Sequence, residues 1–195
     1  MANMPKVSKP PTANSKLTNR DTSTIKGVNF KKGKNWSQSF YTLSRNELLS
    51  DFKQMKSIGL NTIRFQDNKI YNYNVIKNSE RSGVQISFGF NIPSNINWVT
   101  DKKQKNKIQS DILKTVKRLK HHRHIINWHI DMDMLAQINQ HFNKLESPAQ
   151  HYAYLHWLQQ LLVDMKETDA SRRVVIDLEV SPQFSNHLHL IHEQI

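Results

Sequence analysis

The sequence predicts an α/β fold in which about five strand–helix units form a parallel sheet that curls into an incomplete or open (β/α) barrel. Strand-like and helix-like segments alternate along residues 25–180. This alternation is typical of parallel βαβ units, whose right-handed crossovers place the helices on one face of the sheet. The strands themselves alternate apolar with polar residues, whereas a sheet covered on both faces has continuously apolar strands. The polar face must therefore line a barrel interior or an exposed surface.

The first half of the chain carries the clearest helix signal. We expect strands at residues 25–30 and 61–66, with a helix between them. Ser44 and Glu47 form a capping-box pattern before the helix, and Gly59 supplies a C-terminal stop. The apolar positions that predict the buried face of this helix are Leu48, Leu49, Phe52, Met55 and Ile58.

The second half repeats the strand–helix alternation. The expected segments are a short irregular helix within 68–82, a strand at 84–90, a lysine-rich helix through 108–119, a strand at 125–131, a helix that begins at Ser147–Pro148, and a strand at 174–180. On the fourth strand, Ile126, Trp128 and Ile130 share the apolar face, and we expect Trp128 to pack under the helices. On the helix that begins at Ser147–Pro148, Tyr152 and Leu155 begin the apolar stripe.

Composition bounds the domain organisation. The chain of 195 residues has a net charge of +12 and no cysteine. We expect residues 1–22 to be a disordered basic tail and residues 23–195 to form one domain. The chain shows no apolar run long enough to span a membrane and no signal-peptide pattern, so it does not identify a localisation.

The positive charge gathers in two regions. Residues 1–34 carry eight Lys or Arg against one Asp, and residues 101–124 carry nine against two. A basic module that binds an anionic polymer or a membrane surface is one hypothesis for these regions. Nucleic acid is disfavoured as a partner, because no aromatic–basic stacking motif accompanies the charge.

Acidic residues gather near the ends of the fourth and fifth strands. Asp131, Asp133, Asp177 and Glu179 all fall on the polar face by strand alternation. They could form a hydrolase pair or a cation site, or they could be a solvated rim paired to Arg64 or Lys. The sequence leaves both interpretations open.

Four segments resemble, in order, segments of family 2 glycoside hydrolases. They are IKGVNF at 25–30, LSRNELLSDFKQMKSIGLNTIRF at 43–65, VKRLKHHRHIINWHIDMD at 116–133 and DASRRV at 169–174. The first resembles the family's opening Lys-Gly-x-Asn strand, and the second resembles its Met-Lys-x-x-Gly helix followed by Asn-Thr-Ile-Arg. The resemblance covers roughly residues 25–180 and implies part of a TIM barrel.

The resemblance also implies where catalysis would lie. Retaining glycosidases use two carboxylates about 5–5.5 Å apart, one as acid/base and one as nucleophile. The acid/base maps onto Asp133, and the family's preceding Asn maps onto Met132, which cannot make that hydrogen bond. The nucleophile follows a seventh strand, which we expect to be absent, since a full barrel takes about 250 residues. Arg64 matches the family's active-site arginine.

These observations predict a glycoside-hydrolase-like domain with impaired catalysis and a carbohydrate-binding or accessory role in polysaccharide handling. The alternative is an active retaining β-glycosidase whose remaining strands belong to a longer chain. The expected partners are a carbohydrate or polysaccharide and the remaining barrel half or a partner protein, and no cofactor or metal is expected. The substrate-binding candidates are Arg64, Asn29, His129, Asp131 and Glu179 from the strands, with Trp36 and Trp98 as loop aromatics.

Overall fold

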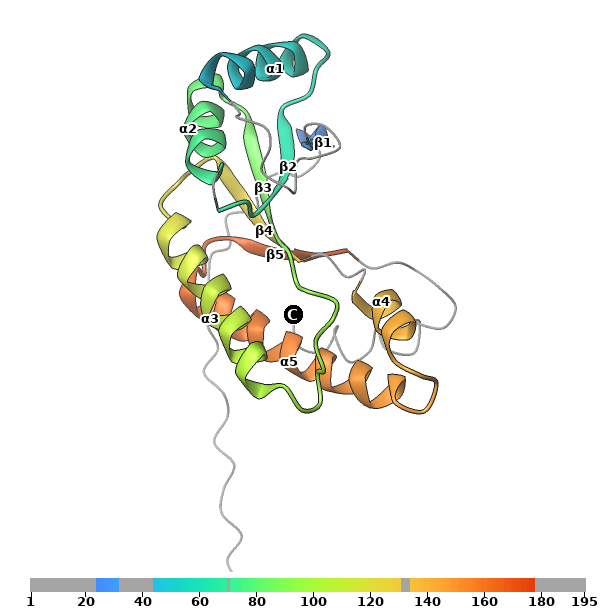
Figure 1. Cartoon of the computed structure of the whole chain (residues 1–195). Helices are drawn as coiled ribbons and strands as arrows, with labels where there is room; N and C mark the ends of the chain where they lie inside the picture. The colour runs from blue at the N-terminus through green and yellow to red at the C-terminus, as the bar shows by residue number, and fades with distance from the viewer. Residues whose placement is uncertain (1–23, 32–43, 70, 131–133, 178–195) are drawn as a thin grey trace, which may run out of the picture.

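The computed structural model describes residues 24–31, 44–69, 71–130 and 134–177 (Figure 1). Strands and helices alternate along these residues. In order, the elements are β1 (Gly27–Asn29), α1 (Arg45–Ser57), β2 (Thr62–Gln66), α2 (Asn72–Ser82), β3 (Gln85–Phe90), α3 (Lys102–Leu119), β4 (Ile125–Ile130), α4 (Met134–His141), α5 (Ser147–Thr168) and β5 (Arg173–Ile176).

The five strands form one sheet in the order β1-β2-β3-β4-β5, and every neighbouring pair is parallel. Each strand therefore pairs with its predecessor in the chain after a helical crossover. Crossovers of one hand in this order put all the helices on the same face of the sheet. The predicted α/β fold with five parallel strands is confirmed. The sheet face that the helices do not cover corresponds to the face that lines the interior of a (β/α) barrel.

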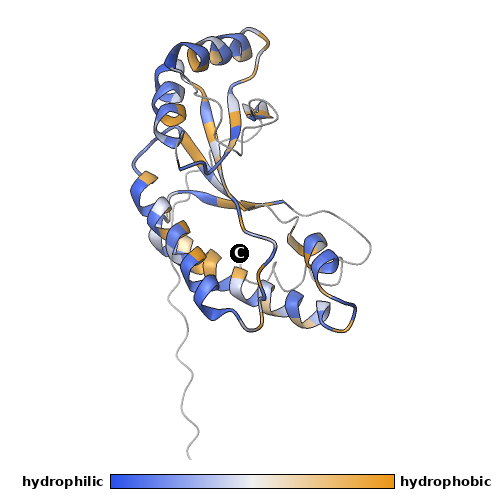
Figure 2. Cartoon of the chain, viewed as in Figure 1, coloured by the Kyte–Doolittle hydropathy of each residue, from blue (hydrophilic) through white to orange (hydrophobic). Residues whose placement is uncertain are grey.

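The face under the helices holds an aromatic core. Phe65, Phe88 and Trp128 are fully buried, and Phe90 is nearly so. The rings of Phe65 and Trp128 each contact Phe88 edge-on, with centroids 6.0 and 5.9 Å apart. Hydrophobic residues are concentrated in the strands, whereas α3 is largely hydrophilic along its outer side (Figure 2). The expected packing of Trp128 under the helices is confirmed.

Local signals fixed α1 as the sequence predicts. The Ser44 hydroxyl accepts from the amide of Glu47, and the Glu47 carboxylate accepts from the amide of Ser44, which completes the capping box. Ile58, expected on the apolar face, instead follows the last helical residue and is 71% exposed. The helix ends one residue too early to turn this side chain towards the core.

The start of α5 differs from the expectation in two ways. Ser147 is its first residue rather than its cap, and its hydroxyl donates to the carbonyls of Phe142 and Asn143. Tyr152, expected on the buried stripe, is 72% exposed, while Tyr154 is fully buried. The physical reason is the contact of Tyr154 with the ring of Trp98, at 4.8 Å between centroids, which turns Tyr152 to solvent.

A bulge in β4 corrects the expected face of Ile126. Ile86 pairs with Ile125, but Ser87 pairs with Asn127, so Ile126 is an extra residue in the ladder. Ile125 is fully buried in its place. Beyond the bulge the expected alternation holds, and Asn127 keeps its place on the polar side.

The helix α4 was not predicted from the sequence. Its Met134, Leu135 and Ile138 are buried against the core. Their spacing is helical, but eight residues is too short a helix for the apolar period to stand out.

Candidate functional site

A cluster of three side chains lies at the carboxyl ends of the strands. Arg64 comes from β2, His129 from β4, and Asp177 directly follows β5. Nη2 of Arg64 lies 2.5 Å from Oδ2 of Asp177, and Nε2 of His129 lies 2.9 Å from the same oxygen. The side chain of Arg64 thus extends across β3 and β4 to the carboxylate of Asp177, the residue after β5. We call these three residues the polar-face cluster.

The three side chains differ in exposure. The His129 side chain is only 5% exposed, whereas Arg64 is 26% and Asp177 44% exposed. The buried imidazole of His129 therefore lies against the carboxylate of Asp177, while the guanidinium and the carboxylate are partly exposed to solvent. A guanidinium offers only donors and an ionised carboxylate only acceptors, so together they can bind hydroxyl groups, which do both.

The strand register places more polar groups beside the cluster. Asn29 on β1 pairs in register with Arg64, and the hydroxyl of Ser87 donates to Oδ1 of Asn127 at 2.5 Å. Gly89 pairs in register with His129, and a Cβ there would meet Cγ of Gln66 at 3.2 Å. Glycine at this position leaves room for the side chain of Gln66 between β2 and β4.

In the structure, three of the predicted binding residues lie on the same face of the sheet, and a fourth, Trp98, is buried away from any ligand. Asn29, Arg64 and His129 all belong to the polar face at this part of the sheet. Trp98 is fully buried between α5 side chains, with the ring of Trp157 at 4.9 Å, so it cannot stack on a ligand. That expectation was wrong because the loop before α3 folds onto α5 and covers the indole.

The remaining predicted site residues lie outside the described residues. They are Trp36, Asp131, Asp133 and Glu179.

The predicted binding set omits Asp177, the residue that joins the cluster. Strand alternation already places it on the polar face, and a rim carboxylate paired to Arg64 was one of the two interpretations of the acidic residues. The distance to Arg64 favours that interpretation for Asp177. Only the register of three successive strand pairs, from β2 to β5, brings these two residues within reach.

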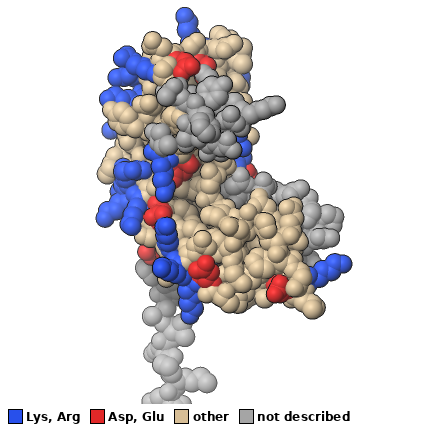
Figure 3. All heavy atoms as spheres, in the orientation of Figure 1, with Lys and Arg blue, Asp and Glu red and all other residues tan. Residues whose placement is uncertain are grey.

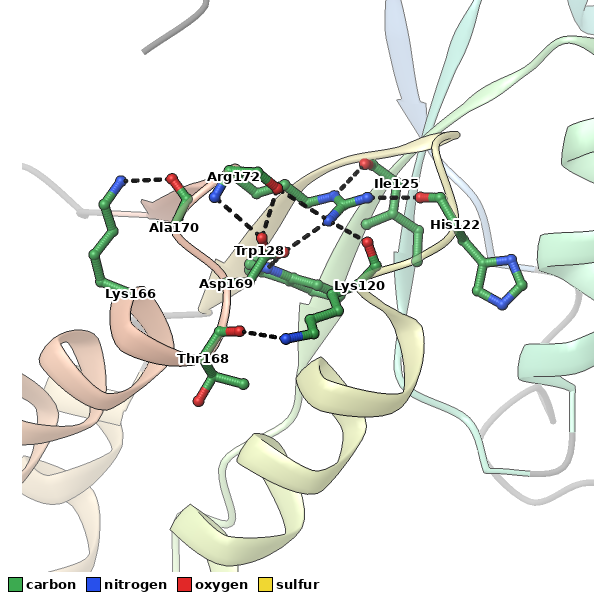
Figure 4. A network of polar contacts seen from close by, with 10 residues as sticks. Lys120, His122, Ile125, Trp128, Lys166, Thr168, Asp169, Ala170 and Arg172 are labelled. Carbon is green, nitrogen blue, oxygen red and sulfur yellow. Dashed lines mark hydrogen bonds and ion pairs between the residues drawn. The ribbon is translucent and has the colours of Figure 1, made fainter. Parts of the chain in front are cut away.

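A second polar network lies at the opposite end of the strands (Figure 4). Arg172 donates to the backbone carbonyls of Lys120, His122 and Ile125 and to Oδ2 of Asp169. The same Oδ2 accepts from the indole of Trp128 at 3.0 Å. The network ties the α5–β5 turn to the α3–β4 turn, so it fixes the base of the sheet and leaves the carboxyl edge free for ligands.

The electrostatics of this network favour an ionised Asp169. Burial by itself raises the pKa of Asp169, but hydrogen bonds from Ser171 and Arg172, the charge of Arg172 and the indole of Trp128 outweigh it. The net effect holds the pKa of Asp169 below its usual value. A carboxylate satisfied by so many donors serves structure rather than proton transfer.

No group of three His, Asp or Glu side chains among the described residues is placed to hold a metal ion. No helix in the same part of the chain is long and apolar enough to cross a membrane.

The comparisons with known proteins bear on the fold. No family model and no curated protein matches the sequence. Among solved structures, β-glucuronidase 2 of Bacteroides uniformis, covalently bound to cyclophellitol-6-carboxylate aziridine, is similar to this chain with a TM-score of 0.67 at 17% identity, over 85% of this chain and 19% of that chain. A further Bacteroides uniformis β-glucuronidase gives a TM-score of 0.63 at 17% identity, over 76% of this chain and 17% of that chain.

A third similar structure comes from another genus. The β-D-mannosidase of Dictyoglomus thermophilum has a TM-score of 0.52 at 16% identity, over 78% of this chain and 18% of that chain. The chain spans about a fifth of the length of these structures. The fold is that of part of a glycosidase TIM barrel. The predicted fold class is thereby confirmed at the level of architecture.

Proposed function

We propose that this chain is a glycoside-hydrolase-like domain that binds a carbohydrate at the carboxyl edge of its sheet. The observation that carries the proposal is the polar-face cluster, in which Arg64 and Asp177 meet at 2.5 Å with His129 beneath them. Ligands of TIM barrels bind at this edge, above the ends of the strands. The glycosidase-like fold of the similar structures supports a sugar as the ligand.

We further propose that the domain descends from family 2 and that its hydrolytic chemistry is impaired. The support is the sequence resemblance, in which Met132 and Asp133 stand where the family has Asn and Glu. Methionine offers no amide for a sugar hydroxyl, and aspartate is one methylene shorter than glutamate. Under this proposal the domain recognises a glycan, or serves a longer polypeptide or partner that completes the barrel, with residues 1–22 as a basic tail and residues 23–195 as the domain.

Binding by the polar-face cluster can be tested with one substitution and a matched control. Arg64→Met removes the guanidinium and keeps the length of the aliphatic stem. Arg81→Met makes the same change on the exposed side of α2, away from the carboxyl edge. Binding to neutral cello-, manno- and galacto-oligosaccharides would be measured by calorimetry. We expect Arg64→Met to weaken the tightest interaction at least about tenfold, the value of one charged hydrogen bond, and Arg81→Met to leave it unchanged.

Hydrolysis needs a separate assay. Release of nitrophenol from aryl β-glycosides by the full chain, lost in Asp133→Ala, would overturn the impaired-catalysis proposal and favour an active retaining glycosidase. Oligosaccharide binding that both arginine variants retain in full would overturn the placement of the sugar at the polar-face cluster.

A further inference from the structure

A groove on the helix-covered side of the molecule carries a concentrated positive charge. The cavity has a volume of about 560 Å³ and runs between α3 and the segments that follow β2 and β3. This volume lies within the usual range for small-ligand sites, about 300–1,000 Å³. Its lining extends along α3 from Gln104 to Arg118, about 21 Å at 1.5 Å per residue, so it suits an extended chain.

The cationic side chains of the groove follow one helical stripe. Lys107, Lys114 and Arg118 all line it, and their spacing of seven and four residues keeps them on one face of α3. Lys69 adds a fourth positive charge from the segment after β2. Within the part of the chain that the structure describes, no hydrogen bond or ion pair engages these four side chains. Figure 3 shows Lys and Arg gathered along this side of the molecule.

The acidic residues of the groove do not cancel this charge. Asp67 and Asp111 line it against the four cations, which leaves a net charge of about +2 at neutral pH. Oδ1 of Asp67 already accepts a hydrogen bond of 2.6 Å from Asn72. Four cationic side chains that no anion among the described residues engages therefore line a groove with a net positive charge, which attracts anionic ligands.

We propose that this groove binds an acidic polysaccharide through the carboxylate or sulfate groups of the polymer. The inference deepens the proposed carbohydrate function, on which it rests, by naming a substrate class and a second binding region. Asp67 and Asn91 directly follow β2 and β3, so the groove opens at the same edge of the sheet as the polar-face cluster.

The chemistry of the lining favours a polysaccharide over other polyanions. Phe90, the aromatic residue that lines the groove, is only 2% exposed, so a nucleic acid base would find no ring there to stack on. A helix that lies in a membrane interface places protruding apolar side chains beside its cations. The groove instead adds the hydrogen-bonding side chains of Asn91, Gln104 and Thr115, which suit sugar hydroxyls.

The test uses the full chain and a pair of probes that differ only in charge. Labelled polygalacturonate and its methyl-esterified form share one sugar backbone, and binding at low ionic strength would be followed by fluorescence anisotropy. We expect polygalacturonate to bind and the ester to bind at least about tenfold more weakly, because each neutralised contact removes a charge pair. Heparin serves as a sulfated probe in parallel.

Two triple variants, each of which reverses three positive charges, distinguish the contribution of the groove to binding from that of the net charge of the protein. The groove variant is Lys107→Glu with Lys114→Glu and Arg118→Glu. The control variant, Lys53→Glu with Arg123→Glu and Lys144→Glu, changes the net charge equally at exposed positions outside the groove. We expect the groove variant to lose at least about tenfold in affinity for polygalacturonate or heparin and the control to lose less than about threefold. Circular dichroism confirms that both variants fold.

Several outcomes would overturn the inference. These are failure of both acidic probes to bind, equal losses in the two triple variants, or equal affinity for the ester and the acid. A single-stranded oligonucleotide or anionic vesicles that bind more tightly, with the same loss in the groove variant, would also overturn it. Neutral oligosaccharide binding tests the carbohydrate function separately, since it should depend on Arg64 and survive in the groove variant.

Discussion

Arg64 on β2 and Asp177, directly after β5, meet at 2.5 Å, although β3 and β4 lie between these two strands in the sheet. Both side chains remain partly exposed, at 26% and 44%. An ion pair in this setting is screened by solvent and adds little to stability. The ion pair is therefore better explained by a role in ligand binding at the carboxyl edge than by a contribution to the stability of the fold.

A double-mutant cycle tests this interpretation. Arg64→Met, Asp177→Asn and the double variant should show a coupling free energy of unfolding below about 1 kcal/mol in urea denaturation. Glycan binding should fall in each single variant. A coupling well above that value, with unchanged binding, would instead make the pair a structural clamp.

The buried pair of Asp169 and Arg172 should behave in the opposite way. Their side chains are 4% and 10% exposed, and Asp169→Ala leaves the guanidinium buried without its counter-ion. We expect a loss of about 3 kcal/mol in the free energy of unfolding. Glu167→Ala, at an exposed position of α5, is the control and should change it by less than about 0.5 kcal/mol. Equal effects of the two substitutions would contradict a structural role for the network.

The lowered pKa of Asp169 predicts a pH dependence with a defined sign. Its carboxylate stabilises the folded state fully above the unfolded-state pKa of about 3.9, and this contribution is lost as the pH falls through the lower folded-state pKa. The stability advantage of the wild type over Asp169→Asn should be constant from about pH 5 to 7 and shrink below about pH 4. Denaturant unfolding across that range measures it, and an advantage that grows on acidification would be inconsistent with the structure.

Two buried tryptophans offer a matched comparison for the indole hydrogen bond. Trp128 and Trp98 are both fully buried, but only the indole of Trp128 donates to a carboxylate, that of Asp169. The Nε1 atom of Trp98 has no hydrogen-bond partner within the described part of the chain. Substitution by Phe should therefore cost about 1.5–3 kcal/mol more at position 128 than at position 98. Thermal or urea unfolding of the two variants gives this difference, and similar costs would show that the hydrogen bond contributes nothing.

Part of the candidate site could be predicted from the sequence. Strand alternation placed Arg64 and His129 on the polar face, because the side-chain period of a strand is fixed by its backbone. The same alternation placed Asp177 on the polar face, but it did not predict which basic residue pairs with Asp177. That choice depends on how far the twisted sheet brings β2 and β5 together, which no local pattern records.

The burial of the loop residue Trp98 could not be predicted from the sequence for a related reason. Trp98 precedes α3 in a segment with no periodicity, so its environment depends on where α5 packs. Tyr154 and Trp157 decide it by contacting the indole at 4.8 and 4.9 Å. Tyr152 lost its expected burial through the same contact.

By itself, the sequence determined the alternation of strands and helices apart from α4, the parallel sheet and the capping of α1 at Ser44. Each of these depends on backbone geometry or on residues a few positions apart, which a single chain displays directly. Only the tertiary structure decided the bulge at Ile126, the pairing of Arg64 with Asp177 and the joining of Lys69 with the lysines of α3 around one groove. Those features depend on side chains from distant elements meeting across a packed sheet, and their distances are set by the fold as a whole.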